Sequence, residues 1–282
     1  MPATLPRRLL AEFLGAMLLV TAVVGSGIMA TTLSPHDGGL QLLENSTATV
    51  FALAVLILIL GPVSGAHFNP VVTVAAWWTG RREPGALTGG DTVAYIAVQT
   101  VGAITGSVLA NAMFGVSQGL SVKDRSDTHL WLGETIATAG LLLLIFALVR
   151  TGRGALAAPA VAAYIGAAYW FTSSTSFANP AITIGRAFTD TFAGISPGSV
   201  PGFVAAQIIG ALIGLSLAAV LYPAPNPPPR SRPRRPCRSR PCHELHRPDR
   251  RRVGGQTGRP RRHRRPRATP HPRPDRHSRR AR

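Results

Sequence analysis

Two heptapeptides decide how this chain folds: HFNPVVT at residues 67–73 and FANPAIT at residues 177–183. Each places an Asn and then a Pro at the head of a short apolar stretch. Asn is a preferred N-cap, and Pro is favoured in the first turn of a helix, where its missing N–H is not needed. The apolar stretches, 68–79 and 179–188, are too short to cross a bilayer. We therefore expect two half-length helices that begin within a membrane.

Composition divides the chain into two parts. Of the 282 residues, 46% are hydrophobic, although the formal net charge is +18. Residues 1–222 contain long apolar runs broken by Gly, whereas 223–282 consists mostly of Arg, Pro, His and small residues. The first part is typical of a membrane domain. The second part cannot bury enough apolar surface to fold, so we predict a disordered Arg/Pro-rich tail.

Two interpretations of the tail stay open. Its excess of Arg is typical of a basic arm that binds nucleic acid or acidic lipid headgroups. Alternatively, the reading frame shifts near Tyr222, since GC-rich codons read out of frame give mainly Arg, Pro and Ala. The only cysteines, Cys237 and Cys242, have no second pair to complete a metal site. We favour a frameshift product or a linker without function, and expect no nucleic-acid partner, no metal and no cofactor.

Six apolar runs are long enough to span a bilayer. They cover about 9–31, 46–62, 92–114, 130–149, 157–172 and 200–221. The half-length segments fall between the second and third runs and between the fifth and sixth. The first run follows Arg7 and Arg8, exceeds a signal-peptide core and lacks a clear small-residue cleavage site, so we interpret it as a span.

Further markers recur in the same order about 110 residues apart. Glu12 in the first run corresponds to Glu134 in the fourth, and Gln99 in the third corresponds to Gln207 in the sixth. These matches indicate a duplication. Because each copy has three spans, the second must enter the membrane from the opposite side, which gives an inverted repeat. The copies cover about 5–115 and 128–222.

The basic residues of the membrane domain indicate its orientation. Under the inverted topology, one membrane face carries Arg7, Arg8, Arg81, Arg82, Arg150 and Arg153. An excess of Lys and Arg favours the cytoplasmic side. We therefore expect a multi-pass protein of the cell membrane with both termini in the cytoplasm.

The membrane domain resembles the aquaporins, the major intrinsic protein family, over roughly residues 5–222. The residues that carry the resemblance are AEFLG at 11–15, SGAHFNP at 64–70, Gln99, Glu134, Asn179-Pro180-Ala181 and Gln207. The resemblance implies an all-α membrane protein with six transmembrane helices and two re-entrant half-helices. It also implies a homotetramer with one pore in each subunit.

The paired motifs predict which molecules such a pore admits and which it excludes. The motif residues are Asn69, Pro70, Val71, Asn179, Pro180 and Ala181. Helix N-termini carry unpaired N–H groups and about half a positive charge each, so two that meet disfavour cations and protons. Both Asn carboxamides would donate hydrogen bonds to a passing water or hydroxyl, and both prolines would stack where the half-helices meet. Alternatively, the Asn residues only cap helices. Val71 departs from the usual Ala.

Three polar residues are expected to support the loops that precede the half-helices. Glu12 and Glu134 lie in apolar spans, where an ionised carboxylate is costly unless it is hydrogen-bonded. The resemblance places each beside one of these loops, where it would accept backbone N–H bonds. His67 is expected to brace its loop rather than bind a metal. No catalytic triad, metal cluster or phosphate loop indicates an enzyme.

The outer constriction departs from the family pattern. Members usually carry Arg directly after the second motif, where this chain has Ile182. Counting back from the motifs places the other filter positions at Thr49, Ala167 and Ser176. Because all four are small or aliphatic, we predict a wide filter of low polarity, as in glycerol-facilitator-like or metalloid-permeable members.

Two features would narrow this filter. A slip of one or two residues at Thr49 would place Val50 or Phe51 there. Arg186 lies one helical turn beyond Ile182 and leans back toward the filter, so it is a further filter candidate. The alternative is an Arg that extends to the lipid headgroups.

These features predict a passive channel for water and small uncharged solutes, either polyols such as glycerol or neutral metalloid hydroxides such as arsenous acid. A water-selective pore is the first alternative. An ion-coupled secondary transporter would need carboxylates lining its site. A protein that binds nucleic acid or lipid through its tail would lose function when 223–282 is deleted.

Overall fold

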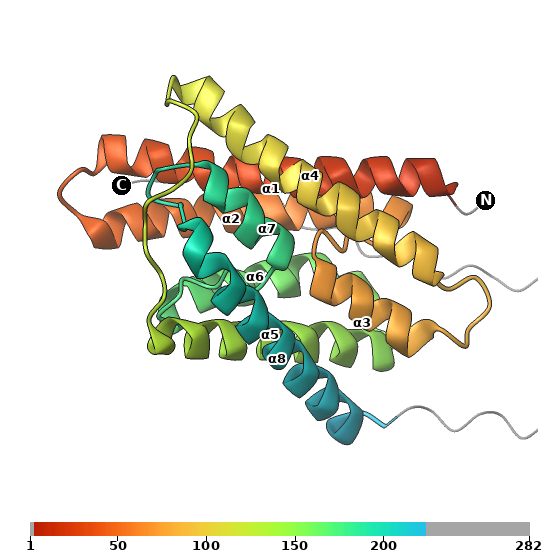
Figure 1. Ribbon diagram of the computed structural model, residues 1–282. Coiled ribbons are helices and arrows are strands. Elements are labelled where there is room, and N and C mark those ends of the chain that lie inside the picture. The colour runs from red at the N-terminus through yellow and green to blue at the C-terminus, as the bar shows by residue number, and fades with distance from the viewer. Residues whose placement is uncertain (1–2, 224–282) are drawn as a thin grey trace, which may run out of the picture. The chain divides into compact units, whose positions relative to one another are not determined.

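The computed structural model describes residues 3–223, which form helices and loops without a strand (Figure 1). The helices are α1 (Leu5–Leu33), α2 (Gly38–Ser64), α3 (Pro70–Gly80), α4 (Gly89–Phe114), α5 (Thr128–Arg150), α6 (Ala157–Phe171), α7 (Pro180–Gly185) and α8 (Val200–Leu221). Short 3-10 turns cover Gly154–Leu156, Arg186–Phe188 and Pro197–Ser199. The predictions for the tail, with Cys237 and Cys242, concern residues outside the described range.

Six of these helices are long and apolar enough to cross a membrane: α1, α2, α4, α5, α6 with its preceding turn, and α8. They correspond to the six predicted runs, and α3 and α7 correspond to the two half-length segments. The predicted all-α membrane fold is therefore confirmed. The largest difference is at α2, which begins at Gly38 rather than near residue 46. The Asp37 carboxylate caps it by accepting from the Leu40 N–H at 2.9 Å.

Equivalent helices of the two copies cross at equivalent glycines, α1 against α4 and α5 against α8. A Cβ atom on Gly102 would overlap the Phe13 carbonyl oxygen, and a Cβ atom on Gly210 would overlap that of Thr135. Only Gly allows the helix backbones to approach so closely. Both halves therefore use the same helix contact, as a duplication requires.

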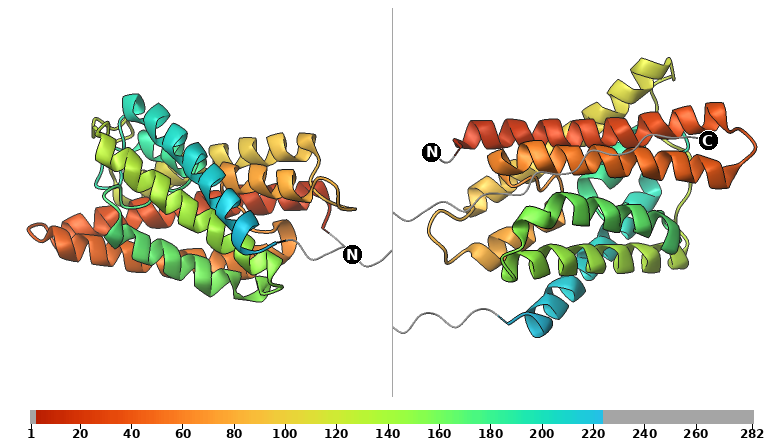
Figure 2. Two further views of the ribbon diagram at one scale, coloured as in Figure 1. Left: turned by 90° about the horizontal axis from the view of Figure 1, so that it is seen from below. Right: turned by 180° about the vertical axis from the view of Figure 1, so that it is seen from behind.

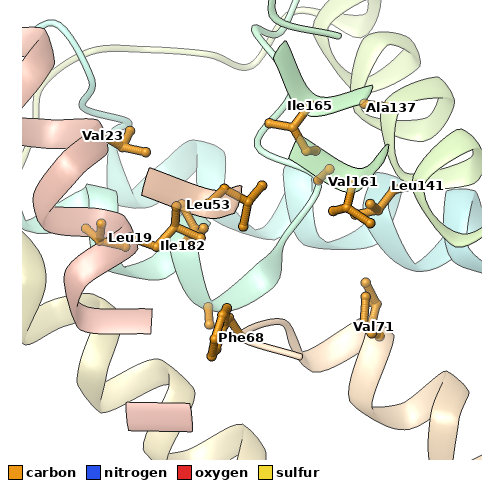
Figure 3. Close-up of a cluster of buried hydrophobic side chains, with 14 of the residues drawn as sticks. Leu19, Val23, Leu53, Phe68, Val71, Ala137, Leu141, Val161, Ile165 and Ile182 are labelled. Carbon is orange, nitrogen blue, oxygen red and sulfur yellow. The ribbon is translucent and has the colours of Figure 1, made fainter. Parts of the chain in front are cut away.

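The two half-helices begin at one point near the centre of the molecule and extend from it toward opposite ends (Figure 1). Apolar side chains of the surrounding helices converge there (Figure 3). Those that Figure 3 labels are Leu19, Val23, Leu53, Phe68, Val71, Ala137, Leu141, Val161, Ile165 and Ile182. The core of the protein thus lies around the start of both half-helices.

Candidate functional site

One cavity of about 680 Å³ is lined by both copies of the repeat. Its walls come from α1, α2, α5, α6, both half-helices and the loops that precede them. It extends from the end of the molecule where α6 and α7 finish to the end where α3 and α5 finish. A lengthwise cavity inside a bundle of membrane-spanning helices is the geometry of a pore.

The two motif asparagines form a reciprocal junction in the middle of this cavity. The Asn69 Nδ2 atom donates to the Ala178 carbonyl at 2.8 Å, and the Asn179 Nδ2 atom donates to the Phe68 carbonyl at 2.7 Å. Each carboxamide NH₂ has two hydrogens. One hydrogen on each side joins the two halves, which leaves the second for a molecule in the cavity that both residues line.

The same carboxamides cap the half-helices through their oxygens. Asn69 Oδ1 accepts from the Val71 N–H at 3.1 Å, and Asn179 Oδ1 accepts from the Ala181 N–H at 3.0 Å. Capping and facing the pore are therefore not alternatives for these residues, because the oxygen and the nitrogen have different partners. Pro70 and Pro180 follow as the first residue of each half-helix.

The loops that lead into the junction have a strained backbone. Ala66 and Phe68 before α3 have φ of 49°, while Ser176 and Ala178 before α7 have φ of 51° and 48°. A residue other than Gly in this left-handed region costs about 1–3 kcal/mol and persists only where the surroundings enforce it. Each loop therefore needs a partner that holds it.

Glu12 is that partner for the first loop. Its carboxylate, fully buried, accepts from the Ser64 hydroxyl at 2.6 Å, the His67 N–H at 3.0 Å and the Phe68 N–H at 2.7 Å. The Gln99 amide donates a fourth bond at 2.7 Å. These four donors replace the water that the carboxylate loses in an apolar span.

Glu134 does the same for the second loop. It accepts from the Phe177 and Ala178 N–H groups, both at 2.8 Å, and from the Gln207 amide at 2.7 Å. Gln207 also donates to the Thr183 hydroxyl at 2.8 Å, which ties the loop to its half-helix. The structure thus places both glutamates where sequence reasoning expected loop supports.

His67 lies against its own half-helix, with its Nδ1 atom 3.2 Å from the Thr73 hydroxyl. It lines the cavity beside Asn69. Among residues 3–223, no group of three or more His, Cys, Asp or Glu side chains has the arrangement of a metal site. This geometry is that of a side chain bracing a loop.

At the end of the cavity where α6 and α7 finish, the prediction for α6 is wrong. Ala167 is exposed on the outer face of α6 and does not line the cavity, whereas Ile165 and Tyr169 do. Residues two apart on a helix point in nearly opposite directions, since each residue turns the helix by about 100°. The count back from the second motif went two positions too far, so Tyr169 takes the place given to Ala167.

Thr49 lies at this constriction without a slip of register. It is 2% exposed, lines the cavity, and its hydroxyl is 3.3 Å from the Tyr169 hydroxyl. Phe51 is 67% exposed on the outside of α2 and narrows nothing. Ser176 and Ile182 of the second repeat also line the cavity.

Arg186 also lines this end of the cavity and is only 4% exposed. Its Nε atom donates to the Ala193 carbonyl, and its guanidinium lies 3.4 Å from the centroid of the Phe177 ring. The alternative, an Arg extended to the headgroups, does not fit this burial. The expectation of a wide filter of low polarity is therefore wrong, because Tyr169, Phe177 and Arg186 line this end, and of these only Arg186 was a filter candidate.

A second arginine, which sequence reasoning missed, approaches the same ring. Arg125, in the connection before α5, has its guanidinium 5.1 Å from the Phe177 centroid, and its Nε atom donates to the Gly194 carbonyl at 2.9 Å. The hydrogen-bond partners of both guanidiniums, within the described range, are uncharged. Of the two, Arg186 lines the cavity, so its guanidinium places a positive charge at this end of the pore. No local pattern marks Arg125, whereas the four-residue spacing of Ile165 and Tyr169 does mark one face of α6.

Comparison with known proteins agrees with this geometry. The sequence model of the family described as major intrinsic protein matches residues 2–175. The chain belongs to the major intrinsic protein family. The resemblance found in the sequence is thereby confirmed, although the second motif lies beyond the matched residues.

Two curated members of the family are similar to this chain along most of their length. Aquaglyceroporin AqpS of Rhizobium meliloti is 49% identical over 197 residues, which cover 70% of this chain and 82% of that protein. Aquaporin AqpM of Methanothermobacter marburgensis is 29% identical over 220 residues, or 68% and 87% of the two chains. A solved structure, the aquaglyceroporin from Plasmodium falciparum, shares the fold with a TM-score of 0.54 at 19% identity, covering 78% of this chain and 96% of that one.

Proposed function

We propose that this protein is a passive channel that conducts water and small uncharged solutes such as glycerol through the cavity described above. The reciprocal junction of Asn69 and Asn179 carries the proposal. It supplies two free N–H donors at the centre of the pore, and these replace part of the hydration that a passing hydroxyl loses.

Positive charge accounts for the exclusion of cations. Both half-helices point their N-termini at the junction, and each end carries about half a positive charge. Arg186 adds a full charge at the constriction. Water and neutral solutes have no such barrier, so they pass while hydrated protons and metal cations are repelled.

The constriction has a polar edge and an apolar face. The hydroxyls of Thr49 and Tyr169 and the guanidinium of Arg186 form the edge, and Ile182 lies on the apolar face. A polyol has the same division, with hydroxyls on one side and CH groups on the other. Glycerol is therefore the solute we propose, and similarity to an aquaglyceroporin supports it. Arsenous acid, a small neutral trihydroxide, is the second candidate.

Water selectivity is the alternative that a specific observation favours. Tyr169, Phe177 and Arg186 bring rings and a cation to a constriction that the sequence predicted to be open. Ion-coupled transport receives no such support. Glu12 and Glu134 face the loops and do not line the cavity, and Glu83, which does line it, is exposed beyond the end of α3.

We further infer a homotetramer in the cell membrane, with both termini in the cytoplasm. The family resemblance supports the assembly, and the arginines at the ends of α3 and α5 support the orientation. Light scattering of the detergent-solubilised protein, corrected for bound detergent, would give the mass of the assembly.

The orientation can be tested with a single reporter cysteine. Ser117 is exposed in the connection between α4 and α5, so Ser117→Cys would present a thiol on the side opposite the termini. Cys237 and Cys242 would be replaced by Ser to leave one reactive position. We expect an impermeant thiol reagent to label this cysteine from outside intact cells, and labelling only after lysis would contradict the orientation.

Stopped-flow light scattering of proteoliposomes tests the proposed conduction. An impermeant osmolyte reports water flux, and glycerol or arsenous acid reports solute entry as swelling after the first shrinkage. We expect fast shrinkage and fast re-swelling in glycerol. Fast shrinkage without re-swelling would establish the water-selective alternative, and rates equal to those of empty liposomes for correctly folded protein would contradict a pore.

A further inference from the structure

The two half-helices pack differently on their long neighbours. In the second copy, a Cβ atom on Gly185 would lie 2.7 Å from the carbonyl of Ala103, so α7 rests directly on the backbone of α4. The Ser107 hydroxyl then donates to the Gly185 carbonyl at 2.7 Å. This contact leaves no room between the two helices.

The first copy lacks both the close backbone approach and the hydrogen bond between its half-helix and its long neighbour. The position equivalent to Gly185 is Ala75, and the positions equivalent to Ala103 and Ser107 are Ala211 and Leu215. The added methyl group prevents the same close approach, and Leu cannot donate a hydrogen bond. The Ala75 carbonyl instead accepts the Thr79 hydroxyl of its own helix at 2.8 Å. α3 therefore lies farther from α8 than α7 lies from α4.

A crevice of about 810 Å³ fills the resulting space between α3, α5 and α8. Its apolar lining includes Val74, Trp78, Ile208, Ala211, Leu212 and Leu215. It is open on the outer, membrane-facing side, where Trp78 is 54% and Leu212 is 62% exposed. It is distinct from the pore, although Thr79, Phe146 and Arg150 line both. The left view of Figure 2 shows α8 running alongside α5.

Basic residues lie at one end of this crevice. Arg150 lines it where α5 and α8 both end, and its Nη1 atom donates to the Ala218 carbonyl at 3.2 Å and to the Tyr222 carbonyl at 2.5 Å. Its other guanidinium nitrogens have no hydrogen-bond partner among the described residues. The Arg81 guanidinium lies 3.7 Å from the centroid of Trp78, which lines the crevice at the end of α3. Within residues 3–223, no Asp or Glu lines the crevice.

We propose that this crevice binds an anionic phospholipid, with one acyl chain between α3 and α8 and the phosphate beside Arg150 and Arg81. An apolar lining that opens to the membrane favours an acyl chain over water. The two cations at one end complement a negative headgroup, and a guanidinium binds phosphate with two parallel hydrogen bonds. Of the two equivalent helix contacts in the inverted repeat, α7 on α4 is closed, whereas the space between α3 and α8 would hold the lipid.

Native mass spectrometry of the full chain, with phosphatidylglycerol and phosphatidylcholine supplied in competition, tests the site. We expect the protein to retain phosphatidylglycerol, and Leu215→Trp to abolish that retention because its larger side chain fills the crevice. Val101→Trp is the matched control, since Val101 is 56% exposed on α4 outside the crevice. Ala219→Trp, at the exposed rim of the crevice, serves as a second variant if Leu215→Trp does not fold.

The headgroup contact has its own pair of variants. Arg150→Gln should lower the preference for phosphatidylglycerol about five-fold, the size expected for one basic residue at an anionic surface. Arg153→Gln, exposed at the same end but outside the crevice, should not change it.

Three results would overturn the proposal. Retention unchanged in both tryptophan variants of the crevice would place the lipid elsewhere, for example on the Arg-rich tail, which all variants keep. Equal effects of the two arginine variants would remove the headgroup contact. A parent protein that retains no phosphatidylglycerol would contradict a lipid site in the crevice.

Discussion

The junction at the centre of the pore and the constriction at its end are built in different ways. At the junction, the bonds that join the two asparagines to the facing loops and the two glutamates to their own loops recur in both copies. At the constriction, the equivalents of Arg186 and Phe177 in the first copy are Ala76 and His67. Conduction therefore depends on what the duplication preserved, and selection depends on what one copy changed.

The largest effects should come from the symmetric part. Glu12→Gln and Glu134→Gln each place an amide NH₂ where a carboxylate oxygen accepts a backbone N–H. A buried N–H left without a partner costs about 1–3 kcal/mol, and bonds to a charged acceptor are worth more. We expect both variants to lose most of the folded assembly, to a similar extent, as measured by size-exclusion yield and water flux per protein.

Glu44→Gln is the control for these two variants, because Glu44 lies on α2 and accepts a bond only from the Ser34 hydroxyl, at 2.9 Å, within the described range. It should assemble and conduct like the parent. Normal yield and flux in Glu12→Gln or Glu134→Gln would show that the loops do not depend on the carboxylates.

Arg186 should have the next largest effect. Arg186→Ala removes the full charge at the constriction, so cation and proton leak should rise on the order of tenfold, which requires a change in barrier of only about 1.4 kcal/mol. Water flux should not fall. A pH-sensitive dye inside proteoliposomes would report the leak, and leak and solute selectivity equal to those of the parent would eliminate a filter role for Arg186.

Tyr169 and Ala167 offer a sharper comparison within one helix. Tyr169→Ala should raise the ratio of glycerol to water permeability several-fold, because it removes a ring and a hydroxyl from the constriction. Ala167→Leu should leave the ratio unchanged, because Ala167 faces outward. The reverse order of effects in stopped-flow swelling would restore the alignment expected from the sequence.

Lys123 should have the smallest effect, and only on stability. Burial, together with the positive charges of Arg125 and Arg186, lowers the pKa of Lys123 to about 8. Because the folded state then releases the proton more readily than the unfolded state, stability should rise with pH from about 8 toward the ordinary Lys pKa near 10.4. Thermal unfolding of the parent should show this rise relative to Lys123→Met; parallel pH profiles would argue against it.

The sequence predicted the junction because local rules govern it. Asn and Pro mark the start of each half-helix, and a carboxylate in an apolar span needs donors. The family resemblance then implied that Glu12 and Glu134 find those donors in the loops. The constriction depends instead on turn geometry. Between Tyr169 and Ser176 the chain leaves α6 and enters a left-handed stretch, so a count through it without gaps reached Ala167.

The position of Arg125 and the crevice beside α3 could not be predicted from the sequence for a further reason. Arg125 reaches Phe177 across 52 residues, as a contact between two loops. The difference between Gly185 and Ala75 is plain in the sequence, but its consequence depends on how closely α7 rests on α4. Long-range packing, rather than the identity of any residue, decided both.

The central claim is that the junction conducts neutral solutes passively. The most direct test is to follow glycerol entry and internal pH together in proteoliposomes, with and without an imposed proton or sodium gradient. The account predicts glycerol entry that is proportional to its concentration difference, is independent of either ion gradient, and leaves internal pH unchanged. Glycerol entry that follows an ion gradient, or that carries protons with it, would contradict it.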